Sequence, residues 1–468
     1  MPELPEVETV KNVLKPIVIG KSIKSIDVLR ATIIQNKPIE SFVDGLVGET
    51  FLDITRVGKF LIFHLSHDKV MISHLRMEGK YFEVGEEEEN TKYARVVFHL
   101  DNGNKLCYDD SRTFGILKLT SEDKWKEEKE VKDLGPEPFV ADPKDIMKQV
   151  SKSHLPIKST LLDQTLMTGL GNIYVDEVLF ASKVHPLTPA NKVALKEWKE
   201  IISNASRILN NAIEAGGSTI RSYHPGKGID GNFQTALLAY GKEGEKCPRC
   251  GHIFRFIKVG GRGTTYCPHC QVKKGGPIKV AIYGRSGSGK SEVSKVFLES
   301  GYPVISADEV VSTLYKKKEV IDLINKTFDL DFSNEVDRKV LRQYLIDNPK
   351  MVNKINKIIH PLVKKEVELF LNKHNEDILV AEVPLLFEAK MENMFDVLLA
   401  VDINEKKQLK NLENRNKGTA LDIKAINSYS KFDEYKEKAD FVINNKLDLS
   451  YLNNSAKEII NKLKDRLD

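Results

Sequence analysis

The first part of the chain alternates short apolar runs with turn residues. Runs such as SIKSIDVLR, FLDITRVG and FLIFHLS are separated by Gly, Asn and Asp, which are typical of turns. This spacing predicts a β-sandwich or barrel-like sheet over residues 1–125. The acidic residues 86–89 interrupt the alternation and predict a solvated loop.

A different periodicity begins at about Leu134. The segments KSTLLDQTL, NIYVDEVLFASK and VALKEWKEIISNASRILNNAIEAGG carry apolar residues three or four positions apart. That spacing places apolar side chains on one face of a helix, and the Gly-Gly pair that ends the last segment is a stop signal. We therefore expect a helical domain over residues 134–240.

The last part of the chain combines strands and helices. The run IKVAIYG predicts a buried strand that leads into a glycine-rich loop, and strand–helix alternation continues to the end. This order predicts a three-layer α/β domain over residues 278–468. Residues 241–271 form a small segment bracketed by cysteines, and the VKKGGP stretch at residues 272–277 predicts a short linker.

Length and composition limit the class of protein. The 468 residues exceed one ordinary core and indicate about two to four domains. A formal net charge of +4 is too small to identify a nucleic-acid binder, so DNA binding has to be argued from local motifs. No apolar run is long enough to span a membrane, and MPELPEVETV lacks the basic start and apolar centre of a signal peptide.

Four of the five cysteines lie in two Cys-x-x-Cys pairs, formed by Cys247 with Cys250 and by Cys267 with Cys270. Four thiolates at this spacing can close a tetrahedral Zn²⁺ site, which is structural because no ligand position stays open. Metal-binding cysteines indicate a reducing compartment rather than a disulfide framework, so we expect a cytoplasmic protein. Cys107 lies outside this group and is most simply a strand residue.

The first three residues carry a possible nucleophile. Pro2 follows Met1, and a small second residue usually permits removal of the initiator methionine. The secondary amine that results is nucleophilic at neutral pH and can form an iminium with a sugar C1′, with Glu3 beside it as a proton donor. On these three residues alone, an ordinary terminus is the simpler interpretation.

The blocks that follow change this interpretation. Eight blocks occur in a fixed order before the cysteine hairpin: MPELPEVETV, GKFL, HLRMEG, DSRTFG, LGPEP, IKSTLLDQ, GLGNIYVDE and GGSTIR. In this order they resemble the formamidopyrimidine-DNA glycosylases through Gln271. The resemblance implies a β-sandwich, a helix–two-turn–helix domain and a zinc hairpin that act on oxidised purines in double-stranded DNA. It also implies that Pro2 attacks C1′ while Glu3 protonates the ribose, before β,δ-elimination cuts the strand.

The same resemblance implies roles for further residues. Lys59 is expected to act in the elimination step, and Glu6 is expected to bond near the site or to support the terminus. Chemistry at C1′ requires the nucleotide to leave the base stack, and Met77, Arg112 and Phe114 are expected to fill the space that it leaves. Contacts to the DNA backbone are expected from His74, Tyr93, Lys158, Asn172 and Arg262, the last held by the zinc hairpin.

The sequence departs from the usual pattern of the family in places. Residues 92–95 replace a segment that often contains His, Ser153 replaces a basic residue, and Thr113 replaces an Arg. The sister family, endonuclease VIII, prefers oxidised pyrimidines, but the MPELPE opening and the pair Arg112 and Phe114 favour the purine-excising branch. The loop at residues 222–234 corresponds to the base-reading loop and leaves lesion preference open. A non-catalytic lesion-binding module is the alternative, which the intact Pro2, Glu3 and Lys59 argue against.

A second motif lies at the start of the α/β domain. GRSGSGKS at residues 284–291 fits the P-loop pattern, with a strand before it and a helix after it. Backbone amides of such a loop cradle phosphates, Lys290 reaches the β- and γ-phosphates of ATP, and Ser291 ligates Mg²⁺. The expected ATP-binding residues of the loop are Gly284, Arg285, Ser286, Gly287, Ser288, Gly289, Lys290 and Ser291.

The blocks beyond the P-loop point to an acceptor. This part of the chain contains the blocks GYPVISADEV, VDRKVL, IIHP, VPLLFE and ADFVINN. In these blocks it resembles dephospho-CoA kinase, which phosphorylates the ribose 3′-hydroxyl of dephospho-CoA. The resemblance implies a helical lid, a catalytic base at Asp308 and an ATP-binding lid charge at Arg415.

Some expected residues of this kinase are replaced. Ser306, Asn411, Ala425 and Tyr429 stand where the family carries Asp, Arg, Arg and Gln. Because phosphoryl transfer depends on positive charge, fewer lid charges predict an active kinase with a weakened hold on ATP, which Arg at position 411 should strengthen. The alternative is a nucleotide-binding domain that has lost transfer activity.

Overall fold

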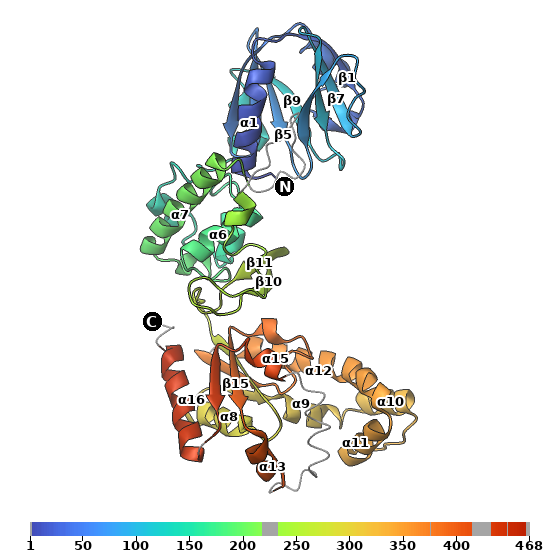
Figure 1. Ribbon diagram of the computed structural model, residues 1–468, viewed down its shortest axis with the longest axis vertical. Helices are drawn as coiled ribbons and strands as arrows, with labels where there is room; N and C mark the ends of the chain where they lie inside the picture. The colour runs from blue at the N-terminus through green and yellow to red at the C-terminus, as the bar shows by residue number, and fades with distance from the viewer. Residues whose placement is uncertain (1, 218–232, 375, 414–431, 447, 465–468) are drawn as a thin grey trace. The chain divides into compact units, whose positions relative to one another are not determined.

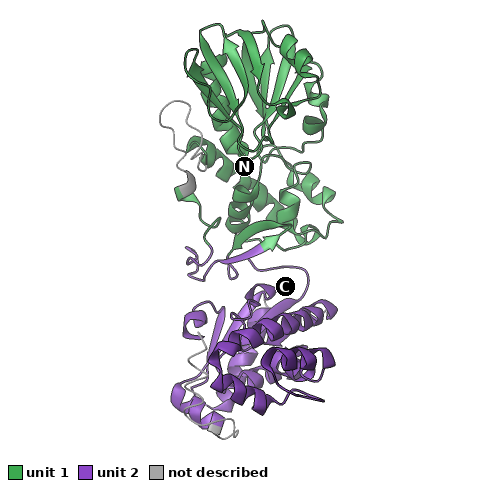
Figure 2. Ribbon diagram, turned by 90° about the vertical axis from the view of Figure 1, so that its right-hand side faces the viewer, with its two compact units in different colours: residues 1–242, 258–266 green, residues 243–257, 267–468 purple. Residues whose placement is uncertain are grey.

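The computed structural model describes residues 2–217, 233–374, 376–413, 432–446 and 448–464 (Figure 1). The chain forms two compact units (Figure 2). One unit contains residues 1–242 and 258–266, and the other contains residues 243–257 and 267–468. Among the described helices, none has both the length and the apolar character that crossing a bilayer requires.

The first unit begins with a helix packed on two sheets, so the predicted β-sandwich is confirmed. Helix α1 (Leu4–Val18) buries Val7, Val10, Leu14 and Val18, the stripe expected of an amphipathic helix. One sheet has the order β1 (Ile23–Val28), β7 (Ala94–Leu100), β8 (Asn104–Asp109) and β6 (Lys80–Gly85). The other has the order β2 (Ile34–Gln35), β9 (Ile116–Ser121), β5 (Lys69–His74), β4 (Phe60–Leu65) and β3 (Phe51–Val57).

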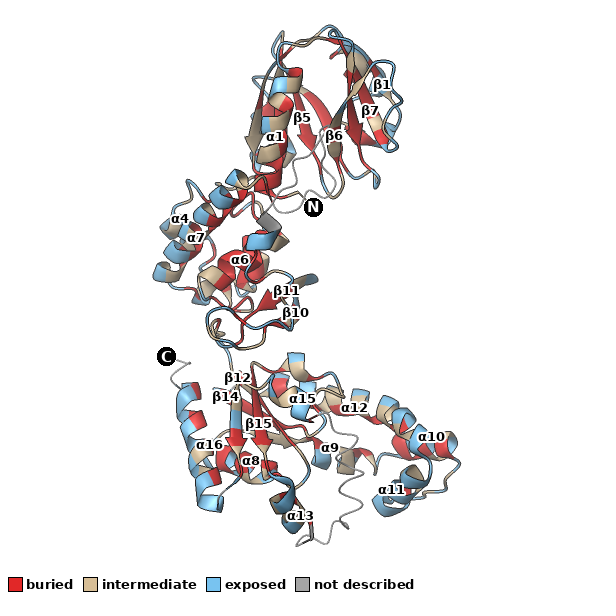
Figure 3. Cartoon of the chain, viewed as in Figure 1, coloured by how far each residue is buried: buried red, intermediate tan, exposed pale blue. Residues whose placement is uncertain are grey.

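Side chains from both sheets and from α1 form one core. Phe63, Tyr81 and Phe98 are fully buried within it, and the interior strands are buried along most of their length (Figure 3). Cys107 is buried on β8, as expected of a strand residue, and residues 86–89 form an exposed turn.

The helical part of this unit follows the connector at residues 134–138. It contains α4 (Pro143–Gln149), α5 (Ile157–Leu161), α6 (Asn172–Ala181) and α7 (Leu195–Glu214). Trp198 of α7 and Tyr174 of α6 are fully buried in a second core. Strands β10 (Arg255–Val259) and β11 (Arg262–Tyr266) form a two-stranded sheet.

The second unit contains a parallel sheet, as the strand–helix alternation predicts. Its order is β13 (Val304–Ser306), β14 (Ile378–Glu382), β12 (Ile278–Tyr283), β15 (Val397–Asp402) and β16 (Phe441–Asn444), and all neighbouring pairs are parallel. Every residue of β14 is buried, which is typical of a strand covered on both faces.

Helices cover both faces of this sheet. The core on one face includes side chains of α8 (Lys290–Glu299) and α16 (Leu449–Lys464). The core on the other face includes α9 (Ala307–Leu314), α10 (Lys318–Phe328), α11 (Arg338–Asp347) and α12 (Val352–Lys373). Helices α13 (Glu405–Glu413) and α15 (Phe432–Lys436) follow β15 in the chain. The P-loop follows β12, so it lies at the carboxyl ends of the strands, where sheets of this type bind ligands.

Candidate active sites

Glu3 occupies a buried pocket at the start of helix α6. Its carboxylate accepts backbone N–H groups from Gly171 (2.6 Å), Ile173 (2.9 Å) and Tyr174 (3.4 Å), and the residue is only 2% exposed. A helix N-terminus is a favourable position for a carboxylate because its first N–H groups have no partner within the helix. Residue 171 has to be glycine, since a Cβ there would lie 2.4 Å from the Glu3 carboxyl carbon.

The protonation of Glu3 is balanced by opposing effects. Burial raises the pKa of Glu3 to about 7, although the nearby Lys59 ammonium acts in the other direction. Burial also lowers the pKa of Lys59, whose Nζ donates to the carbonyl oxygen of Leu170 at 2.7 Å. A carboxyl group with a raised pKa and an amine with a lowered pKa therefore lie in one pocket, an arrangement suited to acid–base chemistry.

Glu6 both supports the terminus and bonds within the site. Its carboxylate accepts the Glu3 N–H at 2.8 Å and the Tyr174 hydroxyl at 2.7 Å. The Leu4 N–H in turn donates to the carbonyl oxygen of Gly169 at 3.1 Å. These bonds tie the beginning of the chain to the GLGNIY turn, with the partly buried Pro2 directly before Glu3.

The turn that carries Lys59 is held by an ion network. The Glu137 carboxylate accepts the Gly58 N–H at 2.8 Å and both terminal nitrogens of Arg56, and Arg56 also pairs with Glu8. The Arg56 guanidinium donates to the Gly58 carbonyl oxygen at 2.9 Å as well. The LGPEP block alone does not indicate a role for Glu137, because the partners of Glu137 lie about eighty residues earlier in the chain.

The expected void-filling residues lie on two turns of the sandwich. Asp110 is fully buried and accepts the N–H groups of Arg112 (3.0 Å) and Gly115 (2.7 Å), which fixes the shape of the loop. This loop presents Phe114 with 55% of its surface exposed, and the Arg112 guanidinium lies 5.4 Å from its ring centre. Met77 is partly buried in the turn after β5.

His74 and Tyr93 differ in exposure. His74 ends β5 and is buried, and its Nδ1 accepts the Arg76 N–H at 2.9 Å. Burial lowers the pKa of His74 to about 3, so the ring is neutral and its Nε2 carries the proton. Tyr93 is 42% exposed, and its carbonyl oxygen accepts the Asp110 N–H. A phosphate contact from either side chain stays a prediction.

Lys158 and Asn172 hold the strand that carries Arg262. The Lys158 Nζ is fully buried between Asp176 (2.6 Å) and the carbonyl oxygen of Gly263 (2.9 Å). The Asn172 side-chain amide donates to the same carbonyl oxygen at 3.1 Å, while Arg262 itself is exposed. The geometry therefore gives Lys158 and Asn172 a positioning role, and their contacts to DNA phosphates stay predictions.

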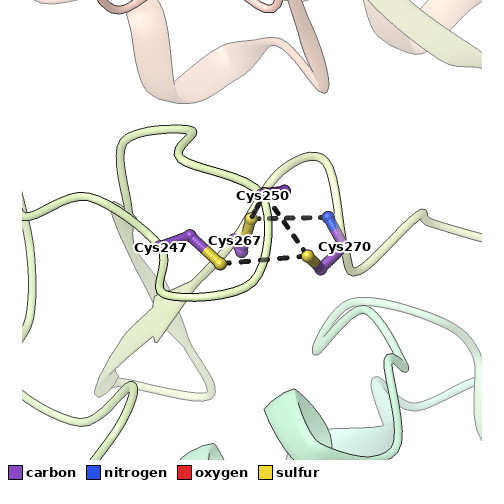
Figure 4. Close-up of side chains that lie close together, drawn as sticks. All are labelled: Cys247, Cys250, Cys267 and Cys270. Atoms are coloured by element: carbon purple, nitrogen blue, oxygen red, sulfur yellow. Dashed lines mark hydrogen bonds between the residues drawn. The ribbon is translucent and has the colours of Figure 1, made fainter.

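The four cysteines of the two Cys-x-x-Cys pairs come together as expected (Figure 4). The Sγ atom of Cys250 lies 3.5 Å from the Sγ atom of Cys267 and 3.4 Å from that of Cys270. The Sγ atoms of Cys247 and Cys270 are 3.8 Å apart. A tetrahedron with Zn–S bonds of about 2.3 Å has sulfur–sulfur separations of about 3.8 Å. The thiols therefore fit one Zn²⁺ ion without rearrangement of the backbone.

The P-loop has the backbone that its glycines predict. Gly284, Gly287 and Gly289 have φ values of 152°, 76° and 102°, which L side chains rarely adopt. The Lys290 Nζ donates to the carbonyl oxygen of Arg285 at 3.0 Å. The Ser291 hydroxyl, the expected Mg²⁺ ligand, donates to a carboxylate oxygen of Glu382 at 3.0 Å.

Glu382 is a candidate site residue that sequence analysis missed. It ends β14, is 6% exposed and also accepts the Ser294 hydroxyl at 3.1 Å. Carboxylate and hydroxyl oxygens are ligands that Mg²⁺ prefers. The available signal was an acidic residue at the end of an otherwise apolar buried strand, directly before VPLLFE.

A cleft of about 970 Å³ joins the P-loop to Asp308. Its lining residues come from the P-loop, from α12 and from the VPLLFE block, and include Lys290, Asp308, His360, Pro361, Leu385 and Glu388. Residues of the GYPVISADEV, IIHP and VPLLFE blocks therefore line one space together with the P-loop, and this space can hold two substrates. Arg415, Ala425 and Tyr429 lie outside the described residues, as does the base-reading loop through residue 232.

Comparison with known proteins assigns each part of the chain. Models of the formamidopyrimidine-DNA glycosylase N-terminal domain and H2TH domain match residues 1–117 and 134–224, and a zinc finger model matches residues 244–272. The formamidopyrimidine-DNA glycosylase of Ligilactobacillus salivarius is 46% identical over 278 residues, 58% of this chain and all of that protein. The chain belongs to the formamidopyrimidine-DNA glycosylase family. The Bacillus subtilis family member is 45% identical with the same coverage.

Solved structures agree with this family assignment. The Lactococcus lactis Fpg in complex with DNA that contains an abasic site is 40% identical, with a TM-score of 0.55. The match covers 58% of this chain and all of that one. A complex of the same enzyme with DNA that contains N7-benzyl-Fapy-dG is 41% identical, again with a TM-score of 0.55.

The remaining part of the chain matches a different family. The dephospho-CoA kinase model matches residues 278–450, so a dephospho-CoA kinase domain follows the glycosylase region. The parallel sheet and the P-loop described above are those of a P-loop kinase. One chain therefore contains both a DNA glycosylase and a kinase domain.

Proposed function

We propose that this chain is a bifunctional enzyme. Its first activity is that of a glycosylase and AP lyase, which removes oxidised purines such as 8-oxoguanine and formamidopyrimidines from double-stranded DNA. Its second activity is the ATP-dependent phosphorylation of dephospho-CoA. We place the protein in the cytoplasm because a four-thiolate zinc site requires reduced cysteines.

The Glu3 pocket is the observation that supports the glycosylase mechanism. The Pro2 amine, free once Met1 is removed, attacks C1′ of the damaged nucleotide and forms an N–C1′ bond. The bond from C1′ to the base breaks, and the departing base takes up the proton that the amine loses. The Glu3 carboxylic acid donates its proton to the ribose ring oxygen as the bond between C1′ and that oxygen breaks, which leaves a C1′=N iminium. A pKa of about 7 suits this step, because the carboxyl group can both hold a proton and release it near neutral pH.

Strand cleavage follows from the iminium that this attack produces. Loss of a proton from C2′ and departure of the 3′-phosphate give β-elimination, and loss of a proton from C4′ with departure of the 5′-phosphate gives δ-elimination. Lys59 is the side chain placed to move protons in these steps, because burial lowers its pKa below the usual value of a lysine. Its bond to the Leu170 carbonyl oxygen holds the amine beside Glu3.

The DNA-binding surface supports the same mechanism. Exposed Phe114 and Arg112, together with Met77, fill the space of the extruded nucleotide, and exposed Arg262 contacts the backbone. His74 and Tyr93 are further proposed contacts to the DNA backbone, and Lys158 and Asn172 contribute to DNA binding by holding the strand that carries Arg262. The zinc ion, held by the four cysteines, keeps the hairpin folded and takes no part in chemistry.

Covalent trapping tests the glycosylase assignment. Borohydride should reduce the iminium and yield a protein–DNA adduct on a duplex with 8-oxoguanine opposite cytosine, and the adduct should map to Pro2. A Pro2→Gly protein and a protein that retains Met1 are the matched comparisons. Equal trapping by all three would exclude the N-terminal amine as the nucleophile.

The cleft that joins the P-loop to Asp308 is the observation that supports the kinase mechanism. Asp308 accepts the proton of the 3′-hydroxyl, whose oxygen attacks the γ-phosphorus of ATP while ADP departs. Lys290 stabilises the charge on the β- and γ-phosphates, and a lid arginine, Arg415, adds a second charge. Ser291 and Glu382 would hold Mg²⁺, which neutralises charge on the transferring group.

Coenzyme A formation tests the kinase assignment. The complete chain should convert dephospho-CoA to coenzyme A in an ATP-dependent reaction, and the Lys290→Ala protein should not. Tight ATP binding without product at saturating dephospho-CoA would instead identify a nucleotide-binding domain that has lost transfer activity.

A further inference from the structure

Three consecutive carbonyl groups in the middle of the P-loop are each held by a side-chain carboxamide. The donors and acceptors are Gln408 to Ser286 (2.8 Å), Asn411 to Gly287 (3.0 Å) and Asn445 to Ser288 (2.8 Å). The side-chain carbonyl of Asn445 in turn accepts the Lys407 Nζ at 2.8 Å.

These amides come from two elements that pack on the loop. Gln408 and Asn411 lie three positions apart on α13, so they share one face of the helix. Leu412 packs on the loop as well, because a Cβ at Gly287 would lie 2.9 Å from its Cγ. Asn445 directly follows β16. Gln408 is fully buried and Asn445 is 6% exposed, so water does not compete for the bonds that these two side chains make.

The geometry of the peptide bond links the held carbonyl groups of the P-loop to the orientation of its N–H groups. In a trans peptide the carbonyl of one residue and the N–H of the next point in opposite directions. Gln408 holds the Ser286 carbonyl and Asn445 holds the Ser288 carbonyl. The N–H groups of Gly287 and Gly289, which follow these carbonyls, therefore point away from the two carboxamides. The Ser288 N–H donates to Arg285 within the loop. Backbone N–H groups fixed in this way are what a P-loop offers to phosphate.

We propose that Gln408, Asn411 and Asn445 form a carboxamide clamp that preorganises the P-loop for the phosphates of ATP. This inference rests on the proposed kinase function and adds three positioning residues to it. The clamp also gives Asn411 a role of its own. Where the kinase family carries Arg, this chain uses a neutral donor that holds the loop rather than the nucleotide.

Steady-state kinetics of the complete chain test the clamp. Gln408→Met and Asn411→Leu preserve side-chain size but remove the donor, and each should raise the KM for ATP by about three- to tenfold, the effect of one lost hydrogen bond. The kcat and the KM for dephospho-CoA should change by less than about twofold, because the acceptor side of the cleft is untouched. Glu405→Gln, exposed on the same helix, is the matched control and should leave all three values unchanged.

Two further measurements separate the clamp from general effects. Asn411→Arg keeps a donor for the Gly287 carbonyl and should bring the KM for ATP back to the wild-type value or below it, unlike Asn411→Leu. Calorimetric titration with ATP reports affinity even where no phosphate is transferred. Weaker ATP binding by the clamp variants supports the clamp even if the wild-type chain forms no coenzyme A, in which case only the kinase function fails. Unchanged ATP affinity in Gln408→Met and Asn411→Leu overturns the clamp.

Discussion

Under the proposed mechanism, the protonation of Glu3 should set the pH dependence of base release. Its raised pKa of about 7 means that the acid form predominates below pH 7 and is lost as the pH rises further. Base release under single-turnover conditions should therefore fall above about pH 7, approaching a tenfold loss per pH unit. On the acidic side, the rate should fall as the Pro2 amine becomes protonated.

Glu3→Gln provides the matched comparison for this pH profile. The amide cannot donate a proton to the ribose, so base release should slow by about 10²- to 10⁴-fold, and the alkaline decline that Glu3 causes should disappear. An alkaline decline of the same position and slope in Glu3→Gln would assign the titration to another group.

Lys59 tunes the same titration. Its positive charge lowers the pKa of Glu3, so removal of that charge should raise the Glu3 pKa and shift the alkaline decline to higher pH. Lys59→Met, which keeps the buried length of the side chain, should show this shift in base release. Gel analysis should show separately that strand cleavage lags behind base release. An unshifted profile would mean that Lys59 does not act on Glu3.

At the scale of elements, Glu137 connects the LGPEP segment to the turn that carries Lys59. Arg56 is 9% exposed and the Glu137 side chain 20%, and Glu8 remains a partner of Arg56 when Glu137 is removed. We predict that Glu137→Ala lowers the free energy of unfolding by about 2–3 kcal/mol, less than complete loss of a buried ion-pair partner. Strand cleavage should fall more than base release, since the Lys59 turn loses its support.

Urea unfolding and a comparison of nicking with base release measure both effects of Glu137→Ala. The exposed pair of Glu127 and Lys132 offers a control, with 67% and 59% of the side chains exposed. Glu127→Ala should change stability by less than about 1 kcal/mol. Equal destabilisation by both substitutions would deny Glu137 a special role.

The sequence predicted those elements whose signals are local. Alternation gave the sandwich, three- and four-residue spacing gave the helical domain, and GRSGSGKS between a strand and a helix gave the P-loop. The sequence did not predict the roles of residues whose partners lie far away in the chain. Glu137 bonds Gly58 across 79 positions and Asn411 bonds Gly287 across 124, so neither neighbourhood reveals its function. The sequence predicts a contact between Lys158 and a DNA phosphate. In the structure the Lys158 side chain is fully buried and forms an ion pair with Asp176, a partner that the local sequence does not indicate.

At the scale of the whole molecule, zinc should matter for only one of the two activities. One Zn²⁺ per chain should bind through the four cysteines, and its removal should abolish DNA binding, since the hairpin that carries Arg262 loses its fold. Coenzyme A formation should persist, because none of the described residues that line the cleft between the P-loop and Asp308 is a cysteine. Metal analysis, DNA binding and kinase assays before and after chelation measure this.

Two cysteine variants complete the zinc experiment. Cys267→Ser should lose the metal, while Cys107→Ser, buried in β8 of the sandwich, should keep it. A metal-free protein with full glycosylase activity would contradict the structural role of the ion.

We expect one chain to perform two unrelated reactions at two separate sites. A single preparation of the complete chain should be assayed for nicking of 8-oxoguanine duplex and for ATP-dependent coenzyme A formation, beside Pro2→Gly and Lys290→Ala proteins. We predict both products from the wild-type chain, loss of nicking alone in Pro2→Gly, and loss of coenzyme A alone in Lys290→Ala. A wild-type chain that yields only one product, or a substitution that removes both products, would contradict the proposal of a bifunctional enzyme with two separate sites.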